Sequence, residues 1–176
     1  MLLDRLQFFL GSNYQVKKLD LEQAKEVWQL QVQDPAYHQV FQAQLPELVE
    51  IEAEMELLPA GADKSQKFYF GFYQADELVA IVDLVLDYPK INQAWLGMIM
   101  VTKQKQGQGH GQKIMQALQA SLKREGYKKL QLANAKALGQ ASQFFTKLDF
   151  VALATLTSQT KRLEEIEVDL LAKNLG

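Results

Sequence analysis

Three glycines spaced two residues apart, Gly107, Gly109 and Gly111, lie between an apolar run that ends at Val101 and a stretch with helical spacing of apolar residues. A chain that leaves a strand and enters a helix presents backbone N–H groups without intrahelical partners. The helix dipole adds roughly half a positive charge there, and glycine lets an anion approach the backbone without meeting a Cβ atom. The stretch 101–118 therefore predicts an anion site, which we interpret as a cradle for the pyrophosphate of a cofactor.

The groups predicted to hold the pyrophosphate are backbone N–H groups, and neighbouring lysines (Lys103, Lys105 or Lys113) could screen its remaining charge. Two other phosphate-binding patterns match less well. When the dinucleotide fingerprint G-x-G-x-x-G is aligned on Gly107, Gln112 stands at the position of its last glycine. The sequence also lacks the spacing and the hydroxyl residue of the P-loop pattern. The residues assigned to the cofactor turn are Gln106, Gly107, Gln108, Gly109, His110, Gly111 and Gln112.

A carboxylate stands in the middle of the long apolar segment 78–88, which predicts a strand. Period-two alternation places Asp83 and Asp87 on one face, opposite an all-apolar face formed by the even-numbered positions. Because an unpaired buried carboxylate is costly, Asp83 is expected either to be solvated in a cleft or to have a partner. We consider it a candidate catalytic or substrate-binding residue, beside the alternative of an ordinary ion pair.

Composition narrows the class of protein. The 176 residues include no cysteine, which excludes disulfides, thiolate metal sites and a cysteine nucleophile. A formal net charge of -2 and a pI near 5.7 argue against nonspecific nucleic-acid binding. No apolar run approaches the roughly 20 residues that span a bilayer, and residues 1–12 lack the features of a signal peptide. We expect one soluble, cytoplasmic domain over residues 1–176.

The charges are distributed unevenly along the chain. Between Asp34 and Asp63 there are seven acidic residues and no Lys or Arg, whereas Val101–Lys129 holds seven basic residues and the single acid Glu125. The basic stretch would suit an anionic ligand and the acidic stretch a cationic one, although both patterns are also typical of solvated helix faces.

Hydrophobic periodicity predicts the elements that position these residues, with helices mostly first and strands afterwards. A strand, a loop, a helix and a further strand around the glycines imply parallel pairing of the two strands. In chain order we expect a strand at 14–19, a helix capped by Asp20, a helical region at 36–57 broken near Pro46, strands at 67–73, 78–88 and 93–101, a helix ending at Gly126, a strand at 128–133, a helix at 140–148, and strands at 150–156 and 164–172.

The chain resembles the GCN5-related N-acetyltransferases (GNATs) in these residues. The turn QGQGHG, residues 106–111, matches the Q/R-x-x-G-x-G/A signature of that family. The segments KFYFGFYQADELVAIVDLVLDYP, WLGMIMV and ASQFFTKLDF look like successive elements of its fold, so the resemblance covers residues 66–150. It implies an α/β (α+β) fold with a mixed central sheet of about seven strands, splayed at the cofactor site and flanked by helices.

The resemblance also implies a reaction and a donor. The expected function is transfer of an acetyl group from acetyl-CoA to a primary amine of a small molecule or a peptide. By analogy with the family, the pantetheine arm pairs with the backbone of Ile99, Met100 and Val101 as an extra strand would, and Phe145 lies in the core or forms a wall along it. His110 is not expected to be catalytic, because its position in the family faces the helix start or solvent.

The proton transfers of such a reaction favour a base over an acid. An alkyl amine with a pKa of about 10.4 must lose a proton, at a cost of roughly 4 to 5 kcal/mol at neutral pH, whereas a thiol leaves as thiolate for about 2 kcal/mol. Asp83 and Asp87 are the candidate bases, with the Glu47–Glu56 face as an alternative. A backbone N–H near residues 98–100 could polarise the thioester carbonyl.

The sequence departs from the family pattern at its usual acid. The tyrosine of the common N-x-x-A-x-x-F-Y-x-K-x-G-F motif falls at Phe145, the asparagine at Leu138 and the glycine at Asp149. Ser142 or Tyr88 could replace the missing hydroxyl, or the thiolate could leave unaided. The alternative function is a catalytically weak or inactive module that binds or senses acyl-CoA. No metal, membrane or nucleic-acid partner is expected, and the closing strands leave a homodimer possible.

Overall fold

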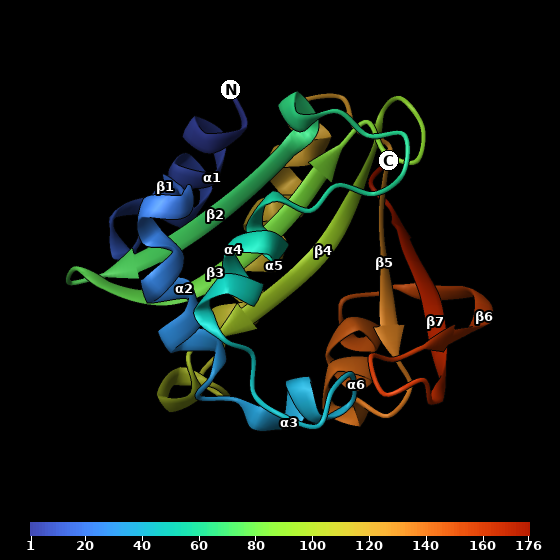
Figure 1. The fold of residues 1–176 in the computed structure, drawn as a ribbon. Coiled ribbons are helices and arrows are strands. Elements are labelled where there is room, and N and C mark those ends of the chain that lie inside the picture. The colour runs from blue at the N-terminus through green and yellow to red at the C-terminus, as the bar shows by residue number, and fades with distance from the viewer.

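The computed structural model describes all residues, 1–176, and contains one seven-stranded mixed sheet with helices on both faces (Figure 1). The strand order is β1-β2-β3-β4-β5-β7-β6, which confirms the predicted sheet. The strands are β1 (Gln15–Lys18), β2 (Lys67–Gln74), β3 (Glu77–Leu86), β4 (Gln93–Val101), β5 (Lys129–Ala135), β6 (Val151–Gln159) and β7 (Glu165–Asn174).

The helices divide between the two faces of the sheet. They are α1 (Leu2–Leu10), α2 (Ala24–Gln31), α3 (Pro35–Gln39), α4 (Leu48–Glu56), α5 (His110–Arg124) and α6 (Gly139–Lys147). Apolar residues of α1 and α5, such as Leu6 and Leu118, join one core cluster under the sheet, and those of α2 and α4, such as Val27 and Ile51, join a second cluster on the opposite face. Figure 1 shows α2 and α4 in front of the sheet with α5 behind it.

Strands β1 to β4 form an antiparallel meander, and β4 then pairs in parallel with β5. The crossover from β4 to β5 runs through α5, as the predicted strand–loop–helix–strand unit requires. Helix α5 begins at His110, within the glycine-rich turn, and ends just before Gly126, whose φ of 96° places it in the left-handed region that glycine adopts without strain. The pairing of β4 in the sheet therefore positions the turn that follows it.

Three expectations need correction. Residues 2–10 form helix α1, which was not predicted from the sequence. The helix forms because Leu2 and Leu6 are one helical turn apart and pack onto the sheet. The helical region at 36–57 is two helices, α3 and α4, separated by more chain than the break at Pro46 alone implied.

The third correction concerns β3, which is buried on both faces because helices cover both sides of the sheet. A β-bulge at Val79 also shifts the alternation. Val79 packs with Ala80 in the first core cluster, and Leu78 packs against the second. Asp83 therefore lies among buried residues.

Candidate active site

Strands β4 and β5 separate along their length and form a splay. Their pairing runs only from Gln93↔Lys129 to Leu96↔Leu132, although β4 continues to Val101 and β5 to Ala135. Figure 1 shows the arrowheads of the two strands diverging. Because Ile99, Met100 and Val101 pair only with β3, the edge of β4 that faces β5 is free of a partner strand from residue 97 onward. This free edge presents backbone N–H and C=O groups to the space between the strands.

The glycine-rich turn follows this free edge and carries a series of backbone donors without partners. None of the N–H groups from Gly107 to Gln112 donates to an acceptor within the chain, and the first backbone bond of the helix is Lys113 N to Gly109 O at 3.1 Å. Gly107 and Gly109 have φ values of 75° and 88°, and a Cβ atom added to either would meet nothing within 4 Å. The turn is therefore an open cradle of unpaired donors at a helix start, which fits a phosphate group.

Side chains around the turn hold its shape. The Gln106 amide donates to Val101 O and to Asp34 Oδ2, each at 2.9 Å, and the Gln108 amide donates to Gln104 O at 3.0 Å. A Cβ atom on Gly111 would lie 3.3 Å from the ring of Phe144, so glycine there lets the start of α5 pack tightly on α6. These side chains position the turn, and its backbone remains available for a ligand.

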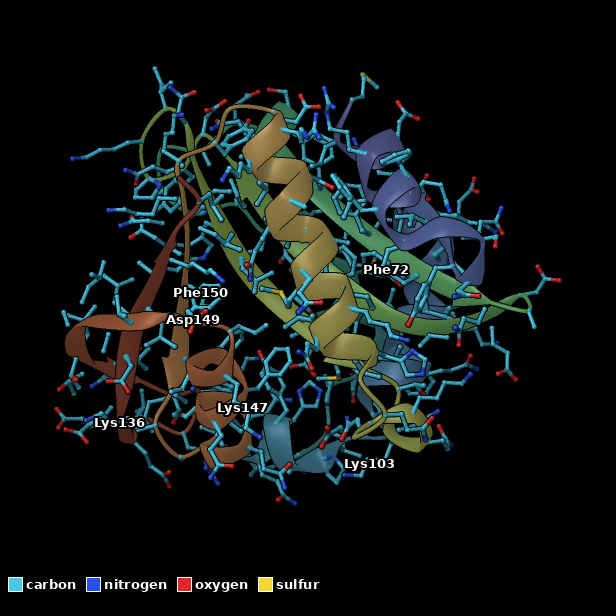
Figure 2. All side chains as sticks on the ribbon, turned by 180° about the vertical axis from the view of Figure 1, so that it is seen from behind. Phe72, Lys103, Lys136, Lys147, Asp149 and Phe150 are labelled. Carbon is cyan, nitrogen blue, oxygen red and sulfur yellow. The ribbon has the colours of Figure 1, made fainter.

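His110 and the lysines near the turn differ in their surroundings. The His110 ring bonds to the Tyr14 hydroxyl, and burial, with Lys105 and Lys113 nearby, lowers its pKa. The Lys105 ammonium donates to Gln74 Oε1 at 3.2 Å. Figure 2 shows Lys103 close to the start of α5 at the open end of the splay. Two lysines, Lys105 and Lys113, thus lie near His110 in the turn.

Asp83 lies beside a bulge in β4, directly next to the splay. The register with β3 passes from Leu84↔Leu96 to Asp83↔Met98, so Gly97 has no partner of its own. A Cβ atom on Gly97 would lie 2.9 Å from Asp83 Oδ2, so only glycine leaves room for this carboxylate. Since Gly97 is the first residue of β4 beyond its pairing with β5, Asp83 lies level with the point where the two strands part.

The partner of Asp83 is Lys67, whose ammonium lies 2.9 Å from Asp83 Oδ2. Lys67 also donates to the carbonyls of Leu57 at 2.8 Å and of Glu54 at 3.3 Å. Burial raises the pKa of Asp83 and Lys67 opposes that rise. The second carboxylate oxygen, Oδ1, is buried and has no hydrogen-bond partner.

A second buried carboxylate, Glu54, lies in the same cluster. Glu54 accepts from the Gln31 amide at 2.9 Å and from the Tyr69 hydroxyl at 3.2 Å, and Tyr69 pairs with Asp83 across β2 and β3. Burial raises the pKa of Glu54, and the nearby charge of Asp83 raises it further. Glu54 belongs to the acidic stretch that the sequence offered as an alternative base, whereas nothing in the sequence distinguished Lys67 or Gln31.

The structure does not bring Asp87 to this cluster. Asp87 lies in the turn after β3, with φ 52°, and its Oδ1 accepts from Asn92 N at 2.8 Å. The turn adjoins the paired end of β4, opposite the splay. Tyr88, one of the candidate acids, lies in the same turn and packs edge-on against Trp95. Both residues serve the turn between β3 and β4.

Phe145 is 6% exposed and packs edge-on between Phe144 and Phe150 in the first core cluster. Ser142, the other candidate acid, accepts from the Asn134 amide at 2.9 Å and donates to Leu138 O at 3.1 Å. Because Asn134 lies on β5 beyond Leu132, Ser142 stands on the β5 side of the splay. Phe145 carries no hydroxyl, and Ser142 lies three residues before it on the same helix.

A hollow of about 710 Å³ lies in the surface away from the splay. Its walls come from the end of β1, the C-terminal end of α4 and the start of β2, and they include Lys67 and Tyr69 but no residue of β4 or the glycine-rich turn. The free edge of β4 and the unpaired N–H groups locate a donor site better than the size of this hollow does, because they match the chemistry of a phosphate-bearing ligand.

Comparison with known proteins agrees with this geometry. The profile of the acetyltransferase (GNAT) family matches residues 26–150, which include β2 to β5, the glycine-rich turn and α6. The chain belongs to the GNAT family of acetyltransferases. The family and the acetyl-CoA donor expected from the sequence are thereby confirmed, since GNAT enzymes use acetyl-CoA. No curated protein matches the chain in sequence.

Solved structures of GNAT proteins share the fold at low sequence identity. An acetyltransferase from Thermus thermophilus aligns with a TM-score of 0.72 at 17% identity over 92% of this chain and 97% of its own. The ribosomal-protein-S18-alanine N-acetyltransferase from Escherichia coli aligns with a TM-score of 0.68 at 14% identity over 93% and 94%. A putative acetyltransferase from Salmonella typhimurium, solved with its cofactor acetyl-CoA, aligns with a TM-score of 0.66 at 11% identity over 94% and 95%. No helix of this GNAT protein has the length and apolarity to cross a membrane.

Proposed function

We propose that this GNAT protein transfers the acetyl group of acetyl-CoA to a primary amine, with Asp83 as the base that removes the proton of the amine. The observation that carries the proposal is the position of Asp83 at the Gly97 bulge, level with the point where β4 parts from β5. A carboxylate at that point lies beside the space between β4 and β5, where a thioester bound along the free edge of β4 would lie.

The residues present fit the cofactor. The unpaired N–H groups from Gly107 to Gln112 would hold the pyrophosphate, and the free edge of β4 at Ile99–Val101 would bond the pantetheine amides. Acetyl-CoA supplies an activated acyl group, whose bond to sulfur breaks as the amide bond to nitrogen forms. Backbone N–H groups beside the Gly97 bulge would stabilise negative charge on the acyl oxygen.

Burial makes Asp83 a stronger base than an exposed aspartate. Burial raises its pKa, and a base works best when its pKa approaches the working pH. Removing the proton of the amine costs more free energy than the departure of the thiolate, since an alkyl ammonium with a pKa of about 10.4 is almost fully protonated at neutral pH. Lys67 orients the carboxylate through Oδ2 and leaves Oδ1 available to receive the proton.

The departing thiol does not require an acid from the protein, because leaving as a thiolate costs only about 2 kcal/mol at neutral pH. This makes the absence of a hydroxyl at Phe145 compatible with turnover. Ser142 is the candidate donor where one is used, because its hydroxyl lies on the β5 side of the splay.

The test combines two measurements. CoA release is followed across a panel of primary amines, and acetyl-CoA binding is followed by calorimetry. We expect micromolar to millimolar acetyl-CoA affinity and turnover with at least one amine. If the protein does not bind acetyl-CoA at millimolar concentration, the proposal is wrong.

Two observations favour a second candidate, a module that binds acyl-CoA without turning it over. Phe145 lacks the expected hydroxyl and is buried, and Asp83 is engaged in an ion pair with Lys67. This alternative predicts normal acetyl-CoA affinity, no turnover on any amine, and no change in affinity on Asp83→Asn.

A further inference from the structure

The segment Gln33–Phe41, which we call the strap, contains α3 and crosses the open end of the splay. At one end, Thr102 and Gln106 bond to the side chains of Gln33 and Asp34, at 3.1 and 2.9 Å. Figure 1 shows α3 below the diverging strands, between α2 and the side of the molecule that holds β6 and β7. The first end of the strap is therefore fixed to the segment that follows β4.

The other end of the strap is fixed to the turn between β6 and β7. Lys161 N donates to Phe41 O at 3.2 Å, and the Arg162 guanidinium donates to Gln39 O at 2.9 Å. The Lys161 ammonium also lies 2.7 Å from Glu50 on α4. The strap thus joins the two halves of the splayed sheet on the face that carries α2 and α4.

The strap packs Tyr37 against the core cluster that contains Tyr69, the tyrosine bonded to Glu54. Tyr37 packs against the second core cluster, which includes Tyr69 and has Met98 at its border. Burial raises the pKa of Tyr37, and the charges of Glu54 and Asp83 raise it further. The strap therefore covers part of the second core cluster, which adjoins Glu54 through Tyr69.

Two buried acceptors under this cover have no donor. They are Asp83 Oδ1 and Gln31 Oε1, and the exposed fractions of their residues are 8% and 0%. A buried acceptor without a partner loses its bond to water and gains nothing in return. Both unpaired atoms in the cluster are acceptors, so the group that would complete it is a donor.

Charge points to the same kind of group. The cluster contains two carboxylates, Glu54 and Asp83, and a single cation, Lys67. A primary ammonium group supplies several N–H donors and one positive charge, and aromatic rings such as Tyr37 and Tyr69 attract cations. An ammonium group would satisfy the acceptors and balance the second carboxylate.

We propose that the acceptor is a small cationic amine, whose ammonium group binds beneath the strap to Asp83 Oδ1 and Gln31 Oε1, and that peptides and proteins are excluded. This inference rests on the proposed function, since it identifies the acceptor of the same site. The exclusion follows from the strap, because a polypeptide acceptor needs an open groove and the strap is bonded at both ends across it. A small molecule needs only a transient opening.

The first experiment compares acceptors in the wild-type protein. CoA release is measured with ethanolamine, butylamine, putrescine and tyramine, and with peptides that carry a free N-terminus or a lysine. Turnover of small amines alone supports the inference. Turnover of peptides at equal or higher efficiency overturns it and leaves the proposed function standing.

The second experiment measures amine binding without turnover, by calorimetry on the wild-type protein and on Gln31→Met, which keeps the side-chain length and removes the acceptor together with the amide that donates to Glu54. We expect the variant to bind the best amine about tenfold more weakly or worse and to keep its acetyl-CoA affinity. Amine binding without turnover in the wild type would overturn the proposed chemistry alone. Absence of amine binding in a folded wild-type protein, or equal binding in a folded Gln31→Met, overturns the inference.

A third variant tests the strap and leaves the buried cluster intact. Arg162→Ala removes the bond to Gln39 O and should let the strap open more often. We expect it to gain peptide turnover, which the wild type lacks, and to keep small-amine turnover. Arg124→Ala, at the exposed end of α5, is the matched control that removes an arginine elsewhere. Peptide turnover that stays undetectable in a folded Arg162→Ala would show that the strap does not select the acceptor.

Discussion

The Lys67 ammonium lies 2.9 Å from Asp83 Oδ2, and only 8% and 11% of the two side chains are exposed. The pair joins the start of β2 to the middle of β3, beside the Gly97 bulge. A buried pair of this kind fixes the orientation of one carboxylate oxygen and leaves the other free. Substitutions at the two residues and their neighbours can separate its structural role from its chemical role.

Asp83→Asn should lower kcat by about a hundredfold or more, because general-base catalysis contributes roughly 10² to 10⁴. Acetyl-CoA affinity should stay unchanged, since the proposed cofactor site is the turn and the edge of β4. Steady-state kinetics and calorimetry measure the two effects. Asp87→Asn is the matched control, because Asp87 caps a turn away from the splay, and it should keep kcat near the wild-type value.

Lys67→Met should destabilise the protein by about 3 to 5 kcal/mol, because it leaves a buried carboxylate without its partner. The double variant Lys67→Met/Asp83→Asn should recover a large part of this loss, since the carboxylate is then absent. Urea unfolding of the two single variants and the double variant gives the coupling. Losses that simply add would contradict a direct interaction between Lys67 and Asp83.

Glu54 gives a pH dependence of stability with a defined sign. Its folded-state pKa is raised above the unfolded value of about 4.3, so its stabilising contribution is full below that value and is lost as pH rises through the folded pKa. Glu54→Gln does not titrate at this position. The unfolding free energy of Glu54→Gln, minus that of the wild type, should therefore increase between pH 4 and pH 7. A difference that stays flat across this range contradicts a raised pKa.

Gly109→Ala should weaken acetyl-CoA binding, because a Cβ atom would occupy the open side of the turn and the φ of 88° is unfavourable for alanine. Gly126→Ala is a close control, since Gly126 has a φ of 96° and open space around its Cβ position at the other end of α5. Both variants should lose similar stability, about 1 kcal/mol. Only Gly109→Ala should lose cofactor affinity, and equal affinity in the two variants would count against the turn as the cofactor site.

The sequence predicted the elements that local patterns specify. The meander at residues 67–101, the helix after Gly111 and the parallel strand that follows lie close to β2–β4, α5 and β5, because period-two alternation, glycine turns and helical spacing are properties of short contiguous stretches. Helix α1 was missed because its nine residues carry only one pair of buried leucines at helical spacing, Leu2 and Leu6. The alternation in β3 was misread at Leu78 and Val79, because a bulge depends on the partner strand.

The cofactor turn and the acceptor side of the site therefore differ in how far the sequence determines them. The turn consists of consecutive residues, Gln106–Gln112, and its unpaired N–H groups follow from the local change from strand to helix. The cluster around Asp83 joins β2, β3, α2 and α4, and the strap adds the turn between β6 and β7. A hydrogen bond or ion pair forms only within a few ångströms. These distant residues come that close only through the register of the strands, the bulge at Gly97 and the packing of helices on one face.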